Sequence, residues 1–364
     1  MSTPIPASWK TPLTERLGCR YPVVQTAMGW VADAGLVTGT TNAGGFGFLA
    51  GATMSTEQLE QSIDTVSRNT RGNFGVNFHM FQPNAREVIE VILRHRDRVR
   101  AISYGRGPDG ATIKRFKDAG ILCMPTVGAL KHAVKAIELG ADIITVQGQE
   151  GGGHTGSVPT TLLLPQVLDA VKVPVVAAGG FHDGRGLAGA LGFGAAGIAM
   201  GTRFLMTSNS PVPRVTLQRY LDVKSPTKIR VSHAVDGMPQ RMVDNKALLA
   251  LESGGLLHRI VTALSSAWKW RAYTHMTLAK MVATFCQALK AGDGAIQTMM
   301  AANAPMLIQR AMVEGRPDEG VLPSGQAAAV IDDLPSCEEL IHGIIAQAVE
   351  LLDAVAADVK ENET

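Results

Sequence analysis

The chain has 364 residues, 46% of them hydrophobic, and its 34 basic residues nearly balance its 32 acidic ones. This length supplies a full core for one large domain or two smaller ones. The near-neutral charge argues against a nucleic-acid-binding protein, because such proteins concentrate positive charge on one face.

Cysteine and histidine usage excludes two further classes of site. The four cysteines lie far apart and form no C-x-x-C pair, and the nine histidines form no metal-ligand cluster, so we expect neither a zinc site nor a redox pair. Cys123 stands in an apolar run and is expected to be a buried thiol. The N-terminus has no signal-peptide pattern, and the charge-free stretches 34–56 and 186–202 contain turn residues. We therefore expect a cytoplasmic protein with no membrane span.

Eight short apolar runs recur along the first part of the chain. They are PVVQT (22–26), GFGFLA (45–50), FGVNF (74–78), VRAISY (99–104), ILCMP (121–125), DIITVQ (142–147), VPVVAA (173–178) and AGIAM (196–200). Runs that are apolar on both faces are typical of parallel strands covered by helices. Helix-like segments lie between them, at 56–69, 85–96, 112–120, 128–140 and 162–172.

This alternation predicts an α/β fold, a (β/α)8 TIM barrel over residues 10–210. A doubly wound open sheet is the alternative. The rhythm stops after Thr207. Residues 211–335 are expected to form a mostly helical cap or substrate region, and residues 336–360 a C-terminal helix that packs on the barrel. Ser336 and Glu339 match a capping box at its start.

Chemistry in a TIM barrel lies at the carboxyl ends of the strands. The pair Gly179-Gly180 follows the seventh run, and Gly201-Thr202 follows the eighth. Barrels often bind a phosphate at these two loops through bare backbone N–H groups, so we expect a phosphate site there. Glycines that only make tight strand ends are the alternative.

The stretch VQGQEGGGHTG (146–156) follows the sixth run. Its three consecutive glycines would let a flat ring system such as a flavin lie against the main chain. Histidine titrates near neutral pH and suits general acid–base work, so His154 is the candidate base, with His79 in reserve. A histidine that only hydrogen-bonds a loop is the alternative.

Six segments together resemble one known family. PVVQTAMGWV, NAGGFGFLA, FGVNF, VQGQEGGGHTG, VVAAGGFHDGRGLAGAL and GAAGIAMGTRFL are similar to the nitronate monooxygenase (2-nitropropane dioxygenase) family. The resemblance implies an FMN-binding TIM barrel in which His154 matches the base. The residues implied to border the flavin or to bind it and its phosphate are Ala27, Met28, Gly29, Gln147, Gly152, Gly179, Gly180, Gly201 and Thr202. Asn77, Thr126 and Gly153 complete the predicted cofactor-binding set.

Segments beyond residue 210 resemble one branch of this family. HAVDGMPQRMV (233–243), LESGG (251–255), MAANAPMLIQRAMVEG (300–315) and LPSGQAAAVIDDLPSCEELI (322–341) look closest to the IpdC-type flavoprotein of bacterial steroid (C/D-ring) degradation. That resemblance implies a small-molecule substrate, a hydrindanone carboxyl-CoA thioester, and a new double bond conjugated with the thioester.

Two other functions stay open. One is a nitronate monooxygenase that oxidises alkyl nitronates with O2, and the other is a non-catalytic flavin-binding protein. Cations of the second region that suit the phosphates of CoA are Lys224, Lys228, Arg230, Arg241, Arg259, Lys269 and Arg271, although scattered surface cations would look the same. The sequence is also compatible with a homo-oligomer.

Overall fold

The computed structural model describes residues 5–80, 82–105, 107–273, 277–279, 281, 283, 300 and 303–361, apart from the side chains of 256–260 and 273. The chain divides into two compact units. The first comprises Met1–Gly151, Gly156–Pro211 and Ile331–Thr364, and the second comprises Gly152–Thr155 and Val212–Val330.

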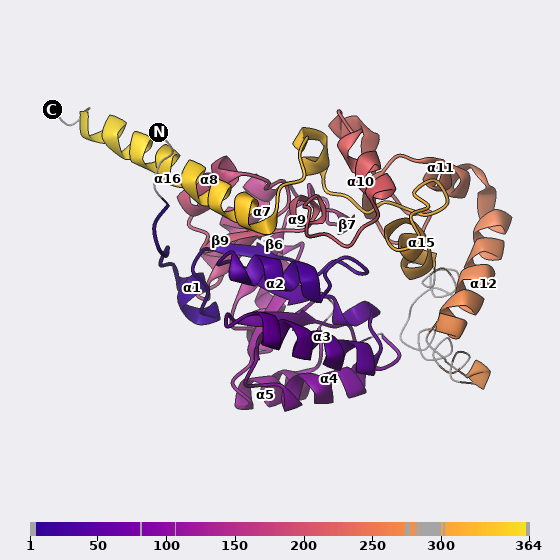
Figure 1. Ribbon diagram of the computed structural model, residues 1–364. Coiled ribbons are helices and arrows are strands. Elements are labelled where there is room, and N and C mark those ends of the chain that lie inside the picture. Colours follow the sequence, from indigo (N-terminus) through magenta and orange to yellow (C-terminus); the bar gives the residue numbers. More distant parts are fainter. Residues whose placement is uncertain are drawn as a thin grey trace. The chain divides into compact units, whose positions relative to one another are not determined.

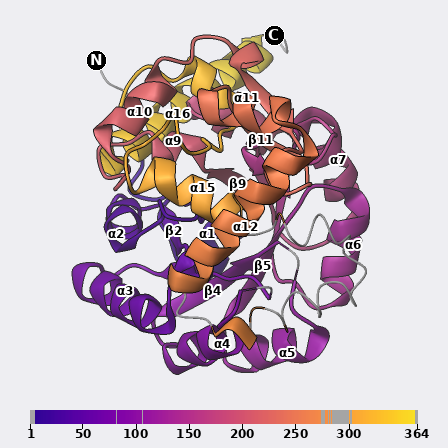
Figure 2. The same cartoon turned by 90° about the vertical axis from the view of Figure 1, so that its right-hand side faces the viewer.

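Eight parallel strands close into a barrel in the described part of the first unit, and Figure 2 shows the helices around them. These strands are β1 (Val23–Gln25), β2 (Phe46–Leu49), β3 (Phe74–Asn77), β4 (Val99–Tyr104), β5 (Leu122–Val127), β6 (Ile144–Gln147), β8 (Val175–Ala178) and β9 (Gly197–Met200). Val24 of β1 pairs with Phe46 on one side and with Ala199 on the other, which closes the ring. The predicted TIM barrel is confirmed, and the open sheet is wrong.

Helices connect successive strands of the barrel. They are α2 (Ala34–Asn42), α3 (Thr56–Asn69), α4 (Ala85–Arg94), α5 (Gly110–Asp118), α6 (Leu130–Glu138), α7 (Thr160–Ala170) and α8 (Gly184–Gly192), with the short η1 (Gly51–Thr53) before α3. The short α1 (Pro12–Leu17) precedes β1, and α9 (Thr202–Leu205) follows β9. Helix α3 shows why the sequence folds this way: Ser55 and Gln58 form a capping box, and Leu59, Ile63 and Val66 bury one face.

The long C-terminal helix α16 (Cys337–Glu361) packs along α8 and α2 in the first unit (Figure 1). Glu339 completes the predicted capping box, since its backbone N–H donates to Ser336 Oγ at 3.2 Å and its carboxylate accepts from the Ser336 N–H at 2.8 Å. Ile341, Ile345 and Ala348 are fully buried on its packed half. Residues 337–360 are also long and apolar enough to cross a membrane, by length and composition alone.

The second unit mixes a small sheet with helices. The strands β10 (Ile229–Ser232) and β11 (Gln240–Val243) pair antiparallel, and β11 also pairs with β7 (Gly153–His154). The helices are α10 (Arg214–Leu221), η2 (Pro226–Lys228), α11 (Lys246–Ser253), α12 (Gly255–Tyr273), α15 (Asn303–Met312) and η3 (Gln326–Val330). Helices make up most of the described part of this region, as predicted. The small sheet was not predicted, because β7 and β11 are brought together from distant parts of the sequence.

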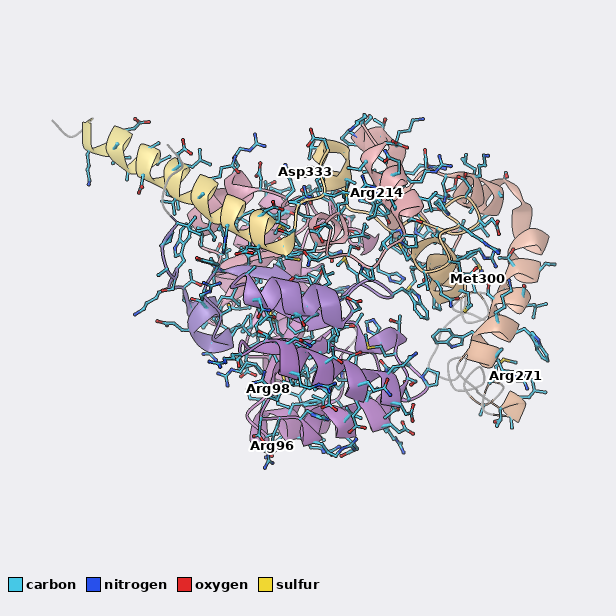
Figure 3. All side chains as sticks on the ribbon, in the orientation of Figure 1. Arg96, Arg98, Arg214, Arg271, Met300 and Asp333 are labelled. Atoms are coloured by element: carbon cyan, nitrogen blue, oxygen red, sulfur yellow. The ribbon has the colours of Figure 1, made fainter. Side chains whose placement is uncertain are left out.

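The apolar side chains of each unit form their own core. In the second unit Val235, Met242, Leu248 and Val321 are among the buried residues that pack together. On α12 the guanidinium of Arg271, labelled in Figure 3, lies 4.7 Å from the ring centroid of Trp268. Arg271 therefore forms a cation–π pair with Trp268 and is not an isolated surface charge.

Among the cysteines that the structure describes, Cys123 and Cys337 are buried, whereas Cys19 is partly exposed. Burial raises the pKa of Cys123 to about 12, and it also raises the pKa of Cys337. The prediction for Cys123 is therefore confirmed, whereas Cys286 lies outside the described residues.

Candidate functional site

The loops after β1 and β9 meet at the carboxyl end of the barrel. The Thr26 N–H donates to the Met200 carbonyl at 3.1 Å. A Cβ atom added to Gly201 would lie 3.1 Å from Thr26 Oγ1 and 3.5 Å from Met28 Sδ. The structure thus brings Met28 and Gly201, two predicted cofactor-binding residues, into contact distance of each other.

The glycine pair after β8 lies against the loop that follows β6. Gly179 and Gly180 have φ angles of 94° and 86°, which a side chain disfavours. A Cβ atom on Gly179 would stand 3.1 Å from the Gly148 oxygen and 3.2 Å from the Gly151 nitrogen. Glycine at position 179 therefore allows the backbone after β8 to pack closely against the loop after β6.

Two residues that the sequence reasoning missed support this glycine turn. The Thr160 hydroxyl donates to Glu150 Oε2 at 2.7 Å, and the Thr160 N–H donates to the same carboxylate oxygen at 3.0 Å. Thr160 Oγ1 also lies 3.0 Å from the Gly179 carbonyl oxygen. Since Thr160 begins α7, the Glu150 carboxylate takes the place of a helix N-cap, where a negative charge is favourable.

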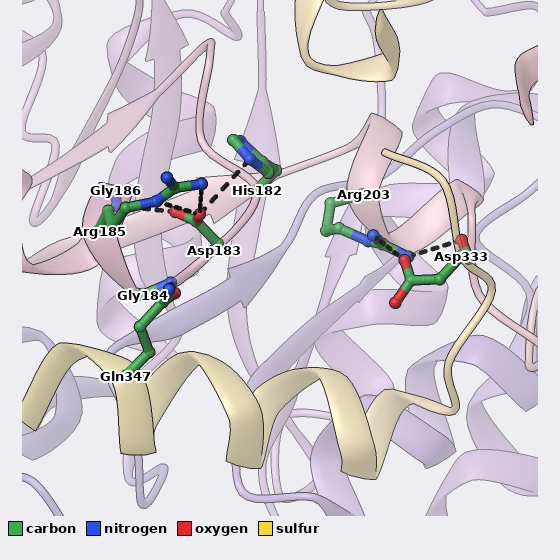
Figure 4. Close-up of polar contacts among 8 residues, drawn as sticks. All are labelled: His182, Asp183, Gly184, Arg185, Gly186, Arg203, Asp333 and Gln347. Carbon is green, nitrogen blue, oxygen red and sulfur yellow. Dashed lines mark hydrogen bonds and ion pairs between the residues drawn. The ribbon is translucent and has the colours of Figure 1, made fainter. Parts of the chain in front are cut away.

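The start of α8 and the residue after Thr202 carry charged side chains, which Figure 4 draws. Asp183 caps α8 by accepting from the Gly186 N–H at 3.2 Å, and it pairs with Arg185 at 2.5 Å. Burial works to raise the pKa of Asp183, but Arg185 and the Gly186 N–H outweigh it and hold that pKa below its ordinary value.

Arg203 links the β9 loop to the segment before α16. The buried guanidinium donates to Asp333 Oδ1 at 2.7 Å (Figure 4). It also donates to the Met206 carbonyl at 2.6 Å. Both partners belong to the first unit. The contact fixes the backbone directly after Gly201 and Thr202.

Other predicted residues have identifiable places on the barrel. Asn77 ends β3 and donates to Ser103 Oγ at 3.0 Å, whereas His79 beyond it is exposed. Thr126 lies in β5 opposite Thr145 of β6, and Gln147 ends β6 opposite Ala178. The remaining barrel residues of the predicted set, Ala27 and Gly29, lie in the loop after β1.

Gly152, Gly153 and His154 belong to the second unit, where Gly153 and His154 form β7. His154 Nε2 lies 2.8 Å from Asp236 Oδ2. The His154 side chain is 52% exposed, whereas that of Asp236 is 5% exposed. Asp236 has no recognisable signal in the sequence, because it is 82 residues from His154.

In the described residues no group of three or more His, Cys, Asp and Glu side chains could hold a metal ion. Each unit therefore has its own candidate functional feature: the first has a glycine-lined barrel rim, and the second has a histidine–carboxylate pair.

Comparison with known proteins places this geometry in context. The family model described as nitronate monooxygenase matches residues 10–95 and 85–347. The chain is 47% identical, over 96% of its length and 98% of the relative, to the (3aS,4S,5R,7aS)-5-hydroxy-7a-methyl-1-oxo-octahydro-1H-indene-4-carboxyl-CoA dehydrogenase of Rhodococcus jostii. The protein of the same name from Mycobacterium tuberculosis is also 47% identical, with 96% of this chain and 99% of the relative covered.

Solved structures show the same architecture. FabK from Thermotoga maritima superposes with a TM-score of 0.79 at 25% identity, and the match covers 96% of this chain and 99% of that one.

Proposed function

We propose that this chain, which belongs to the nitronate monooxygenase family, is an FMN-dependent dehydrogenase of a steroid-derived hydrindanone carboxyl-CoA thioester. It is an oxidoreductase, as its relatives are. The observation that carries the choice of substrate is 47% identity, over 96% of this chain, to relatives named for that activity.

The barrel rim fits FMN on its own geometry. Gly180 is exposed and Gly179 is partly exposed, and a Cβ atom on either glycine would be strained by its positive φ. We expect these residues, with Gly201 and Thr202, to hold the phosphate, and Ala27 and Met28 to border the ring. Backbone N–H groups at such loops are a common phosphate-binding device in TIM barrels.

The proposed reaction removes a proton and a hydride from adjacent carbons. The thioester carbonyl acidifies the proton on its α carbon, and His154 accepts that proton. Bound FMN would supply the hydride acceptor. His154 follows the barrel strand β6 closely in the chain, and its imidazole is partly exposed, so a substrate can reach it.

Exposed cations of the second unit suit the phosphates of CoA. Lys224, Lys228 and Lys269 are exposed. Arg230, by contrast, is already engaged by the carboxylates of Asp244 and Glu252, and the side chain of Arg259 lies outside the described ones. The lysines are therefore the better candidates for phosphate contacts.

Anaerobic mixing of the purified flavoprotein with candidate substrates tests the proposal. The hydrindanone carboxyl-CoA thioester should bleach the flavin absorbance, and small alkyl nitronates should not. Bleaching by nitronates alone would make the protein a nitronate monooxygenase, and bleaching by neither would leave a flavin-binding protein without this catalysis.

Two histidine variants test the base in the same assay. His154→Ala should keep its FMN and slow flavin reduction by ~10²-fold or more, the usual contribution of acid–base catalysis. His79→Ala is the matched control, and we expect it to reduce its flavin at the normal rate. The opposite pattern would transfer the role to His79.

A further inference from the structure

The carboxylate of Asp236 is buried and accepts hydrogen bonds at both oxygens. Oδ1 accepts from the Met238 N–H at 3.0 Å, and Oδ2 accepts from Gln240 Nε2 at 2.6 Å. His154 Nε2 lies 2.8 Å from the same Oδ2. A buried carboxylate is costly unless its oxygens are hydrogen-bonded. The hydrogen bonds to both oxygens of Asp236 therefore compensate for its burial and hold it in a defined position.

The backbone around this carboxylate is fixed from several sides. His154 on β7 lies directly opposite Gln240 on β11, and the Thr155 N–H donates to the Pro239 carbonyl at 3.2 Å. The Asn303 amide donates to the Val235 carbonyl at 3.1 Å, which anchors the loop between β10 and β11. The histidine and the carboxylate are therefore held by the same small sheet.

We infer that Asp236 is a positioning residue that fixes the tautomer and orientation of the His154 ring. An ionised carboxylate only accepts hydrogen bonds, so His154 must donate its Nε2–H to it. In the neutral ring the lone pair then lies on Nδ1. Nδ1 is thus the atom that takes the substrate proton, an assignment that rests on the proposed role of His154 as base.

The proton balance follows from this tautomer. The bond between hydrogen and the α carbon breaks, and its proton forms a bond to Nδ1 of His154. The electron pair of the broken α C–H bond forms the new double bond as the neighbouring carbon loses a hydride, and bound FMN would supply the acceptor for that hydride. The imidazolium that results carries a proton on both nitrogens, and the Asp236 carboxylate stabilises its charge through the Nε2–H.

Asp236→Asn should reverse the tautomer without removing the side chain. An amide group in this position presents an N–H donor, which favours a lone pair on Nε2 and a proton on Nδ1 of His154. Flavin reduction should then slow at least ~10-fold, the usual loss when the hydrogen-bond partner that orients a functional histidine is changed. FMN absorbance and substrate KM should stay close to those of the parent. Asp244→Asn is the matched control. Asp244 directly follows β11, and its carboxylate pairs with Arg230.

The tautomer is measured directly by NMR of protein labelled with 15N-histidine at about pH 9, where an ordinary imidazole is neutral. The His154 signals are assigned by their loss in His154→Ala. The parent should show the proton on Nε2, and Asp236→Asn should show it on Nδ1. A parent protein with the proton on Nδ1 overturns the inference even if the variant does not fold.

The two proposals fail in different ways. If His154→Ala is slow and Asp236→Asn reduces its flavin at the parent rate, the base is right and the positioning role of Asp236 is wrong. If His154→Ala itself reduces its flavin normally, the base is wrong and the catalytic role of Asp236 is lost with it.

Discussion

The effect of replacing a glycine near the barrel rim depends on its backbone conformation. Gly180 has a positive φ angle, whereas Gly189 lies inside a helix. Gly180 has a φ of 86°, and an added Cβ atom would only touch Glu150 Cβ at 3.5 Å, an ordinary contact. The strain of a side chain there comes from the backbone alone. Gly189 lies inside α8, is exposed, and would place a Cβ atom in open space.

The two glycines should therefore respond to alanine with opposite signs. Gly180→Ala should destabilise the protein by ~1–2 kcal/mol, because a left-handed backbone disfavours a Cβ atom. Gly189→Ala should stabilise it by ~0.5–1 kcal/mol, because alanine is the better helix former. Chemical unfolding of both variants measures the difference, and a loss of stability in both would contradict the assigned geometry.

Glycine pairs were visible in the sequence, but the partner of His154 was not. The glycines at 179–180 and 201 follow apolar runs, and that local pattern is enough to place them at strand ends. Asp236 becomes meaningful only when β7 pairs with β11, and the two residues are 82 positions apart. A long-range pairing of this kind leaves no periodic signal in the sequence.

Secondary elements were predicted best where the pattern repeats. All eight barrel strands coincide with apolar runs, because a strand buried on both faces needs apolar residues throughout. Strand β7 has two residues, one of them a glycine, and is held by its neighbour rather than by its own composition. The sequence pattern does not predict β10 and β11 either, although it correctly predicts that the second region is mostly helical.

The stability contributed by helix α8 should depend on pH, because the ionisable residue Asp183 caps its N-terminus. The pKa of Asp183 is lowered in the folded protein, against the effect of its burial, by Arg185 and the Gly186 N–H. Its charge thus contributes stability that is present above the unfolded pKa of ~3.9 and is lost as pH falls through the lower folded pKa.

Asp183→Asn isolates this charge, since asparagine caps a helix as well as aspartate does. The variant should lose ~0.3–1 kcal/mol from about pH 5 to 8, and the difference should shrink below about pH 4. Unfolding curves at a series of pH values measure it, with the exposed Asp353→Asn on α16 as control. A deficit that stays constant down to pH 2 would show that the charge of Asp183 is not the cause.

The chain consists of two units, and the residues expected to bind the FMN phosphate all belong to one of them. Gly179, Gly180, Gly201 and Thr202 all lie in the barrel unit, whereas His154 and Asp236 lie in the other. A ligand that binds the folded state stabilises it by mass action. FMN should therefore act first on the unfolding of the barrel.

Calorimetry of the protein without and with flavin tests whether FMN stabilises the barrel unit against thermal unfolding. FMN at 100 times its Kd should add about 2.7 kcal/mol to the stability of the barrel unit and raise its melting temperature by roughly 5–10 °C. Riboflavin at the same concentration should raise it less, because it has no phosphate for the glycine loops to bind. Equal shifts with both compounds would mean that these loops do not bind the phosphate, since the ring alone would then account for the affinity.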